Sequence, residues 1–399
     1  MLQMEEAIEI LQEQVTAIRE TEQIPLLEAV GRILAQEGRA GLDQPPFPRS
    51  PLDGYAVRGQ DTEGAGKENP KLLQVIGKIY AGEAFSGRVG ENQAVRLMTG
   101  APIPDGADTV IRQENSDYGE DQVQIYQSSK PYQNYCYQGE DYQAGAVLLK
   151  QGQVMDGAAV SVAASMGLQE VSVYRKPRIA VISTGDELTE PGIPLKAGKI
   201  YDSNLYLICG RLAELGATPV YSCHWDDEPE GLAEEIRKLA GKTDLIVTTG
   251  GVSVGEKDIM HEVIRLLAAR QLFWRVNVKP GAPTLAAVYE GTLIICLSGN
   301  PFAAAANFEL LVRPVMGKLT GDKRWMVKKI RARLETDYSK PKGSRRFLRG
   351  YAEDGKVWLA AGNHASGALS SLVGSNCLVE ILPDQAGARK EEEVWVYLL

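Results

Sequence analysis

The sequence predicts a multidomain α/β protein with a central α/β domain built on a parallel sheet. An N-terminal helical domain, an inserted β-rich domain and a small C-terminal β domain are expected beside it. Three observations lead to this fold class. The chain has 399 residues, too many for one ordinary domain. Its apolar fraction of 44% is sufficient for several cores. The spacing of its apolar residues also changes along the chain, from helical to alternating and back.

The composition excludes several classes of protein. Lys and Arg total 43 against 52 Asp and Glu, a formal net charge of −9, which argues against a general nucleic-acid binder. No apolar run approaches the roughly 20 residues that span a bilayer, and the acidic, amphipathic start is unlike a signal peptide. Five cysteines are scattered singly with no CxxC pair, which indicates reduced thiols. We therefore expect a cytoplasmic protein that binds neither nucleic acid nor membrane.

The N-terminal region is predicted to be helical. Ile8, Leu11 and Val15 recur at spacings of three and four, the pattern of one buried helix face, and a shorter pattern follows over residues 26–34. Residues 44–51 contain four prolines, which bar both helix continuation and central-strand pairing, so a domain boundary is expected there.

Short β-branched and aromatic runs separated by Gly, Asn and Asp clusters characterise residues 52–149 and indicate a β-rich segment. The pattern returns to helix over residues 152–167, so this segment is predicted to be inserted into the helical domain. The expected division places the helical domain at 1–45 plus 147–175, the insertion at 46–146, the α/β domain at 176–325, and a β-barrel-like domain at 326–399.

The α/β domain is predicted from fully apolar strands that alternate with helices. Residues 179–183, 217–223 and 244–249 are such strands, and each is followed by a helical pattern. Ligands of parallel sheets bind outside the carboxyl ends of the strands. The loops that follow the strands are therefore where the chemistry is expected. Past residue 328, alternating runs predict the small C-terminal β module.

One glycine-rich loop carries the clearest signal for a binding site. Residues 248–258, TTGGVSVGEKD, lie between a predicted strand and a predicted helix. Gly250 and Gly251 allow backbone N–H groups to close on an anion, and Ser253 adds a hydroxyl donor. Asp258 would repel a phosphate unless Mg²⁺ lay between them. The alternative is a tight glycine turn in which Asp258 only favours the start of the helix.

Further polar clusters follow the other strands of the sheet. Each of them alone is typical of a helix cap or a solvated loop. Their predicted convergence at one sheet edge favours a phosphate-bearing ligand held with Mg²⁺. The residues concerned are Thr184, Gly185 and Glu187, the acidic run at Asp226, Lys279 before Pro280 and Gly281, the nearby Arg275, and Ser298 and Asn300.

These motifs resemble a known family. The loop 248–258, STGDEL at 183–188 and KPG at 279–281 resemble the molybdopterin-binding fold. LDGYA at 52–56, TGAPIP at 99–104 and GED at 139–141 are similar to motifs of the molybdopterin molybdenumtransferases, the family that includes the gephyrin E domain. The resemblance covers nearly the whole chain, in order.

The resemblance implies Mg²⁺-dependent insertion of molybdenum from molybdate into adenylylated molybdopterin, with release of AMP. It implies a homodimer whose active cleft lies between the α/β domain of one subunit and the inserted domain of the other, with transient contact to the adenylyltransferase. Matched by position, the implied catalytic residues are Asp53, Glu187, Asp258 and Lys279, and the implied metal ligands are Glu187, Asp226 and Asp258. The implied substrate-binding residues are Thr99, Asp141, Thr184, Gly185, Asp226, Gly250, Gly251, Ser253, Arg275, Ser298 and Asn300.

Three departures from the family pattern affect single residues. Pro48 and Arg49 stand where the family often has Asp-Asn, Arg275 replaces a lysine, and Gln138 replaces an arginine. Two other functions stay open. The first is molybdopterin adenylylation, although stand-alone adenylyltransferases lack the inserted and C-terminal β domains. The second is a non-catalytic scaffold like the gephyrin relative, although no low-complexity linker is visible here.

Overall fold

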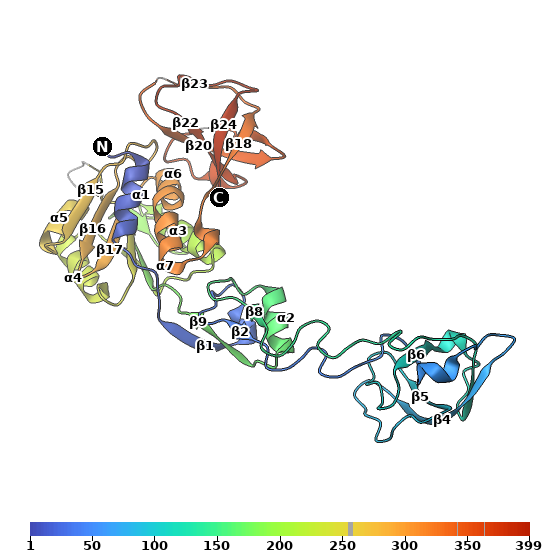
Figure 1. Ribbon diagram of the computed structural model, residues 1–399. Coiled ribbons are helices and arrows are strands. Elements are labelled where there is room, and N and C mark those ends of the chain that lie inside the picture. Colours follow the sequence, from blue (N-terminus) through green and yellow to red (C-terminus); the bar gives the residue numbers. More distant parts are fainter. Residues whose placement is uncertain (254–257, 341, 363) are drawn as a thin grey trace. The chain divides into compact units, whose positions relative to one another are not determined.

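The computed structural model describes residues 1–253, 258–340, 342–362 and 364–399. Contacts within the chain divide it into two compact units, which are described separately (Figure 1). The first unit contains Met1–Gln23, Gly31–Ala35 and Ser172–Leu399, and the second contains Ile24–Val30 and Gln36–Val171.

A six-stranded sheet of order β13-β10-β14-β17-β16-β15 forms the centre of the first unit. The four strands that pair in parallel are β13 (Tyr221–Trp225), β10 (Ile179–Thr184), β14 (Leu245–Thr249) and β17 (Thr292–Leu297). The parallel part agrees with the prediction. It extends through antiparallel β16 (Leu285–Tyr289) to β15 (Arg270–Trp274). Glu290 and Gly291 join β16 to β17 with positive φ at both positions, a two-residue hairpin that only antiparallel strands permit.

Helices cover both faces of this sheet because β10, β14 and β17 are apolar on both faces. Ile179 and Val181 of β10 pack in the core that contains α1 (Met4–Glu13), α3 (Asn204–Glu214), α6 (Pro301–Asn307) and α7 (Arg313–Thr320). The alternate residues Ala180 and Ile182 pack against α4 (Pro229–Leu239) and α5 (Met260–Leu266) on the other face. A π-helical turn, η4 (Phe308–Val312), joins α6 to α7.

The first predicted helix is confirmed and the second is not. Met4, Ala7 and Leu11 are the buried residues of α1, at the helical spacing. Residues 26–34, predicted to be helical, contain only the short 3₁₀ turn η1 (Leu26–Ala29), which follows strand β1 (Thr21–Pro25). Leu27 is 84% exposed, so the apolar spacing there corresponds to no buried helix face.

The C-terminal region forms a closed barrel of order β18-β21-β20-β22-β24. Alternate residues of the strands fill its core, among them Leu334, Val379 and Val396. The strands are β18 (Lys328–Leu334), β20 (Arg346–Glu353), β21 (Lys356–Leu359), β22 (Cys377–Ile381) and β24 (Glu393–Leu398), and the short pair β19 (Tyr338–Ser339) and β23 (Gly387–Ala388) accompanies them.

The second unit is rich in β-structure, as predicted. Its largest sheet has the order β6-β3-β5-β4-β7. These strands are β3 (Gly54–Val57), β4 (Lys71–Ile79), β5 (Gln93–Leu97), β6 (Thr109–Arg112) and β7 (Gln122–Ile125). The predicted return to helix is α2 (Gly157–Ser165), which begins where the Asp156 carboxylate accepts the Ala159 N–H at 2.8 Å. A short pair, β2 (Gly38–Arg39) and β8 (Val147–Leu149), completes the unit.

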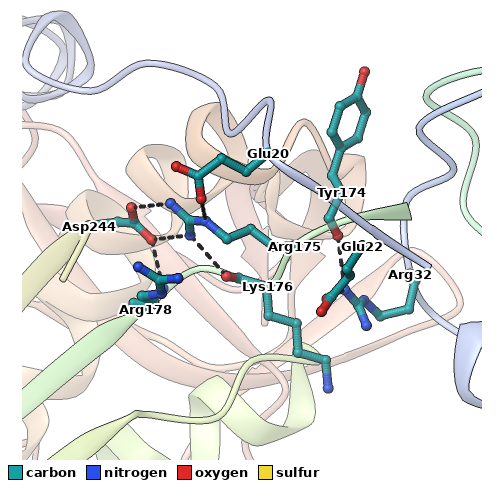
Figure 2. Close-up of polar contacts among 8 residues, drawn as sticks. All are labelled: Glu20, Glu22, Arg32, Tyr174, Arg175, Lys176, Arg178 and Asp244. Atoms are coloured by element: carbon teal, nitrogen blue, oxygen red, sulfur yellow. Dashed lines mark hydrogen bonds and ion pairs between the residues drawn. The ribbon is translucent and has the colours of Figure 1, made fainter. Parts of the chain in front are cut away.

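A charged network holds the start of the α/β region in the first unit (Figure 2). The Arg175 guanidinium donates to both oxygens of Asp244, at 2.7 and 2.9 Å, and also pairs with Glu20. The backbone N–H of Arg178 donates to the same Asp244 carboxylate at 2.7 Å. Asp244 directly precedes β14, so this network fixes the end of β14 opposite the glycine loop.

All five cysteines are free thiols. Within the described ranges, no helix has the length and apolar character needed to cross a membrane.

Candidate active site

A cavity of about 650 Å³ lies at the carboxyl edge of the central sheet. Its walls come from the segments after β10, β14 and β17 and from the start of α3. This is the edge at which the sequence predicted the chemistry. Of the predicted site residues, the lining contains Thr184, Gly185, Glu187, Gly250, Gly251, Ser253, Asp258, Ser298 and Asn300.

Buried hydrogen bonds join these segments into one rim. The Ser183 hydroxyl donates to the Asp202 carboxylate, whose other oxygen accepts the Leu205 N–H at 3.1 Å. The side-chain amide of Asn204 donates to Thr249 Oγ1 at 3.0 Å and to the Gly299 carbonyl at 2.8 Å. The start of α3 is therefore tied to the ends of three neighbouring strands.

At Gly250 the glycine loop lies too close to Thr184, at the end of β10, to leave room for a side chain. Gly250 has φ +105°, and a Cβ there would lie 2.7 Å from Thr184 Oγ1 and closer still to the Thr184 carbonyl oxygen. Gly251 has φ +58°, in the left-handed region. Residues 254–257 of the predicted motif lie outside the described residues. The described part of the loop has the small residues and backbone freedom that an anion site requires.

Two buried polar atoms of the lining have no hydrogen-bond partner within the described part of the chain. They are Thr184 Oγ1 and Asn204 Oδ1, on residues that are 3% and 8% exposed. The Asn204 amide orientation is fixed because its nitrogen faces the Gly299 carbonyl, which only accepts. Buried polar groups are nearly always hydrogen-bonded, so these two atoms are candidates to contact a ligand.

The acidic residues divide between two cavities. Glu187 and Asp258 line the first cavity, together with Asp227. Asp226 instead lines a second cavity of about 780 Å³, where its carboxylate lies 3.4 Å from His224 Nε2. The expectation that Asp226 shares the rim with Glu187 and Asp258 is therefore wrong, and Asp227 takes that place. The chain bends at this point, where the Glu228 N–H donates to the Asp226 carbonyl at 2.7 Å, and the two neighbouring side chains line different cavities.

Asp227 is held to the loop after β10. Its carboxylate accepts the Asp186 N–H at 3.2 Å, and its own N–H donates to the Asp186 carboxylate at 3.0 Å. Among the described residues, no three His, Cys, Asp or Glu side chains gather closely enough to hold a metal ion by themselves. A cation in this cavity would need ligand atoms from the substrate as well.

The basic residues predicted for the rim do not line the cavity. Lys279 is exposed, and its backbone is paired with the barrel: its N–H donates to the Arg345 carbonyl at 2.8 Å and its carbonyl accepts the Phe347 N–H at 2.9 Å. From the same turn Gly281 does line the cavity, and a Cβ there would lie 2.5 Å from the Asn307 amide. Arg275 is half-buried outside the lining.

The barrel contributes to the cavity wall through Ser366 and Gly367. The Phe302 N–H donates to the Ser366 carbonyl at 2.9 Å. Buried Arg349 donates to the carbonyls of Ala365 and Ala368, and its guanidinium carbon lies 4.0 Å from the centre of the Phe302 ring. Burial lowers the pKa of Arg349.

Sequence reasoning missed several lining residues, namely Asp202, Asn204, Ser366 and Gly367, and it chose Asp226 rather than Asp227 from the acidic run after β13. A signal was available for the first two, because Asp202-Ser203-Asn204 opens a predicted helix directly beside the sheet edge.

The remaining predicted residues, Asp53, Thr99 and Asp141, belong to the second unit. The Asp53 carboxylate accepts both the backbone N–H and the hydroxyl of Thr99, each at 2.7 Å. These hydrogen bonds hold the pKa of Asp53 below its ordinary value. Asp141 is exposed.

Three family models match successive parts of the chain. The MoeA N-terminal region (domain I and II) matches residues 2–167, the probable molybdopterin binding domain matches 180–318, and the MoeA C-terminal region (domain IV) matches 331–399. Together they cover most of the sequence.

Curated relatives and solved structures agree with these models. The chain is 36% identical over 382 residues to a molybdopterin molybdenumtransferase of Staphylococcus epidermidis, which covers 95% of this chain and 91% of the relative. It is 35% identical over 379 residues to one of Staphylococcus aureus, covering 94% and 90%. The crystal structure of a molybdopterin biosynthesis moeA protein from Pyrococcus horikoshii superposes with a TM-score of 0.86 at 32% identity, covering 100% of this chain and 98% of the other.

Proposed function

Because the chain belongs to the molybdopterin molybdenumtransferase family, which inserts molybdenum in molybdenum cofactor biosynthesis, we propose that its substrates are molybdate and adenylylated molybdopterin. In this proposal, AMP is released as molybdenum enters the pterin dithiolene. One observation carries it. The cavity at the carboxyl edge of the sheet combines the Gly250-Gly251 turn, the Ser253 hydroxyl and the carboxylates of Glu187 and Asp258 in one lining.

The chain's own groups suit binding and orienting an anion. The Gly250 N–H already donates to the Leu297 carbonyl at 3.1 Å, so the donors proposed for the phosphate groups are the Gly251 N–H and the Ser253 hydroxyl. Thr184 Oγ1 and Asn204 Oδ1 are positioned to orient polar atoms of the ligand, since within the described residues both lack partners. Cleavage of a phosphoanhydride depends mainly on positioning and on stabilising charge, which such a rim provides.

The lining also fits Mg²⁺. This ion is usually bound by one or two protein carboxylates together with phosphate oxygens, and carboxylates line the cavity. Glu187 and Asp258 would hold it, and Asp227 stands where Asp226 was expected. When bound, Mg²⁺ would offset the negative charge of the phosphates. The same carboxylates without a cation would repel an anionic ligand.

Further parts of the proposal concern assembly. We propose a homodimer with four domains in each subunit, divided as the sequence predicts. In this arrangement the partner subunit's Asp53, the partner subunit's Thr99 and the partner subunit's Asp141 complete the site, with Asp53 acting near the dithiolene. We place the protein in the cytosol, in transient contact with the adenylyltransferase. Mixing inactive Asp53→Ala and Asp258→Ala proteins tests the shared site, because a mixed dimer would keep one intact site and regain activity.

Incubation with adenylylated molybdopterin, Mg²⁺ and molybdate tests the function. AMP release that depends on molybdate supports the transferase, whereas consumption of ATP with free molybdopterin would indicate the adenylyltransferase. If the protein shows neither AMP release nor ATP consumption, it would be a scaffold.

Three aspartate variants test the site. Asp258→Ala should abolish AMP release with the oligomeric state unchanged, because a carboxylate of the lining is lost. The neighbouring residues Asp226 and Asp227 give a matched pair. Asp227→Ala should lower AMP release more than Asp226→Ala, whose carboxylate lines the second cavity. Normal turnover by Asp258→Ala protein would refute its metal role, and the reverse order for the pair would refute the assignment of Asp227.

A further inference from the structure

Trp274, the last residue of β15, joins the glycine loop to two other elements. Its indole Nε1–H donates to the Val252 carbonyl at 3.2 Å. Val252 lies within the cavity lining and is 2% exposed. Through this hydrogen bond the indole ring contacts the loop segment 250–253.

The faces and edges of the same ring are also occupied. His261 of α5 packs edge-on against it, with ring centres 4.7 Å apart. The guanidinium carbon of Arg275 lies 4.5 Å from the centre of the indole, at cation–π distance. Arg275 adopts φ +76°, which is uncommon for a long side chain, while its N–H donates to the Thr284 carbonyl at 2.9 Å. The indole of Trp274 therefore contacts both the glycine loop, through Val252, and the Arg275 guanidinium.

The hydrogen bond to Val252 also determines where the next N–H points. The Val252 carbonyl and the Ser253 N–H belong to one planar peptide unit, and in a trans peptide the two bonds point in opposite directions. Since the carbonyl is directed at the indole, the Ser253 N–H is directed away from it. Ser253 itself lines the cavity.

We propose that Trp274 is a positioning residue for the transferase, which orients the Val252–Ser253 peptide so that its N–H binds a phosphate oxygen of the substrate. The inference rests on the proposed function for the identity of the substrate only. Arg275, stacked on the same indole, adds positive charge beside the loop. Without the indole N–H the loop would be less often in the binding-competent arrangement, which weakens binding and leaves the bound reaction unchanged.

Trp274→Phe tests this role, because phenylalanine keeps an aromatic ring beside His261 and removes the indole N–H. Loss of one hydrogen bond predicts a rise of about fivefold in the KM for adenylylated molybdopterin and in the Kd for AMP measured by calorimetry, with kcat unchanged. Trp358→Phe is the control. Trp358 lies in the barrel, is 39% exposed and is absent from the cavity lining, so both constants should equal those of the wild type.

Amide hydrogen exchange of the peptide that covers residues 249–253 gives a readout that needs no substrate, and Trp274→Phe should accelerate it. If Trp274→Phe protein does not fold, 3-benzothienylalanine at position 274 keeps the ring shape and removes only the N–H. Wild-type affinity with wild-type exchange in either variant would overturn the inference, and so would a fall in kcat at constant KM. Wild-type protein that releases no AMP would instead refute the proposed substrate, while exchange still decides on Trp274.

Discussion

Two reasons require a glycine at position 250, and comparing Gly250→Ala with a control variant separates them. The first reason is conformation, because φ +105° disfavours any side chain. The second is space, because the added Cβ would lie 2.7 Å from Thr184 Oγ1 and closer to the Thr184 carbonyl oxygen. To reach ordinary contact distance, the loop and the end of β10 would have to separate by about 1 Å.

Gly241 is the matched control for the conformational part. It follows α4 with φ +72°, and a Cβ there would meet nothing within 4 Å. Gly241→Ala should therefore cost about 1 kcal/mol of stability and leave kcat/KM within about twofold of the wild type. Gly250→Ala adds the displacement, and a misplacement of about 1 Å can lower a rate about 100-fold. We expect kcat/KM for AMP release to fall by about that factor.

Steady-state AMP release at varied concentration of adenylylated molybdopterin measures both variants, and thermal unfolding reports their stability. The close approach between Gly250 and Thr184 predicts that Gly250→Ala loses more stability than Gly241→Ala, and that only Gly250→Ala loses kcat/KM at a temperature where both variants are folded. Equal kcat/KM for Gly250→Ala and Gly241→Ala would refute the reasoning, because it would mean that the cavity tolerates the displaced loop.

Two further predictions concern the other polar contacts. Thr99→Val removes one of the two hydrogen bonds that lower the pKa of Asp53, so the pKa of Asp53 should rise. In the wild type these hydrogen bonds stabilise the folded protein while Asp53 is ionised, and the stabilisation is lost as pH falls through the pKa of Asp53. A lowered or unchanged Asp53 pKa in a carboxyl NMR titration of the variant would contradict this prediction. Asp244→Ala leaves the mostly buried Arg175 without its bidentate partner and should cost about 3 kcal/mol. Glu22→Ala breaks the ion pair between Glu22, whose side chain is 44% exposed, and Arg32, and should cost less than about 1 kcal/mol. Equal costs for Asp244→Ala and Glu22→Ala in urea unfolding would refute the difference.

Much of the central domain could be predicted from sequence because its strands are apolar on both faces. All six residues of β10 are buried, so a continuous apolar run marked the strand and its end marked the cavity. The glycine loop was visible for a similar reason, since Gly250 is required by a local backbone conformation. The parallel strands of the central sheet were therefore predicted correctly, whereas the apolar spacing over residues 26–34 was misleading because most of that segment is not a helix.

Features that depend on side-chain direction or on distant contacts were not predicted. Asp226 and Asp227 are adjacent in sequence, and only the orientation of each side chain decides which cavity it enters. Lys279 was expected on the rim because it follows a predicted strand and begins a rigid Pro-Gly turn, but its backbone pairs with a barrel strand nearly seventy residues later. No sequence motif predicts that Ser366 lines the cavity, because hydrogen bonds of backbone carbonyls, to the Phe302 N–H and to buried Arg349, hold its segment in place.

The order of synthesis gives the Ser366-Gly367 wall a consequence for the newborn enzyme. A ribosome makes the glycine loop and Phe302 more than sixty residues before it makes Ser366, whose carbonyl accepts the Phe302 N–H. While this late segment is still inside the exit tunnel, the cavity lacks one side. A nascent chain should therefore complete this cavity only when translation is almost finished.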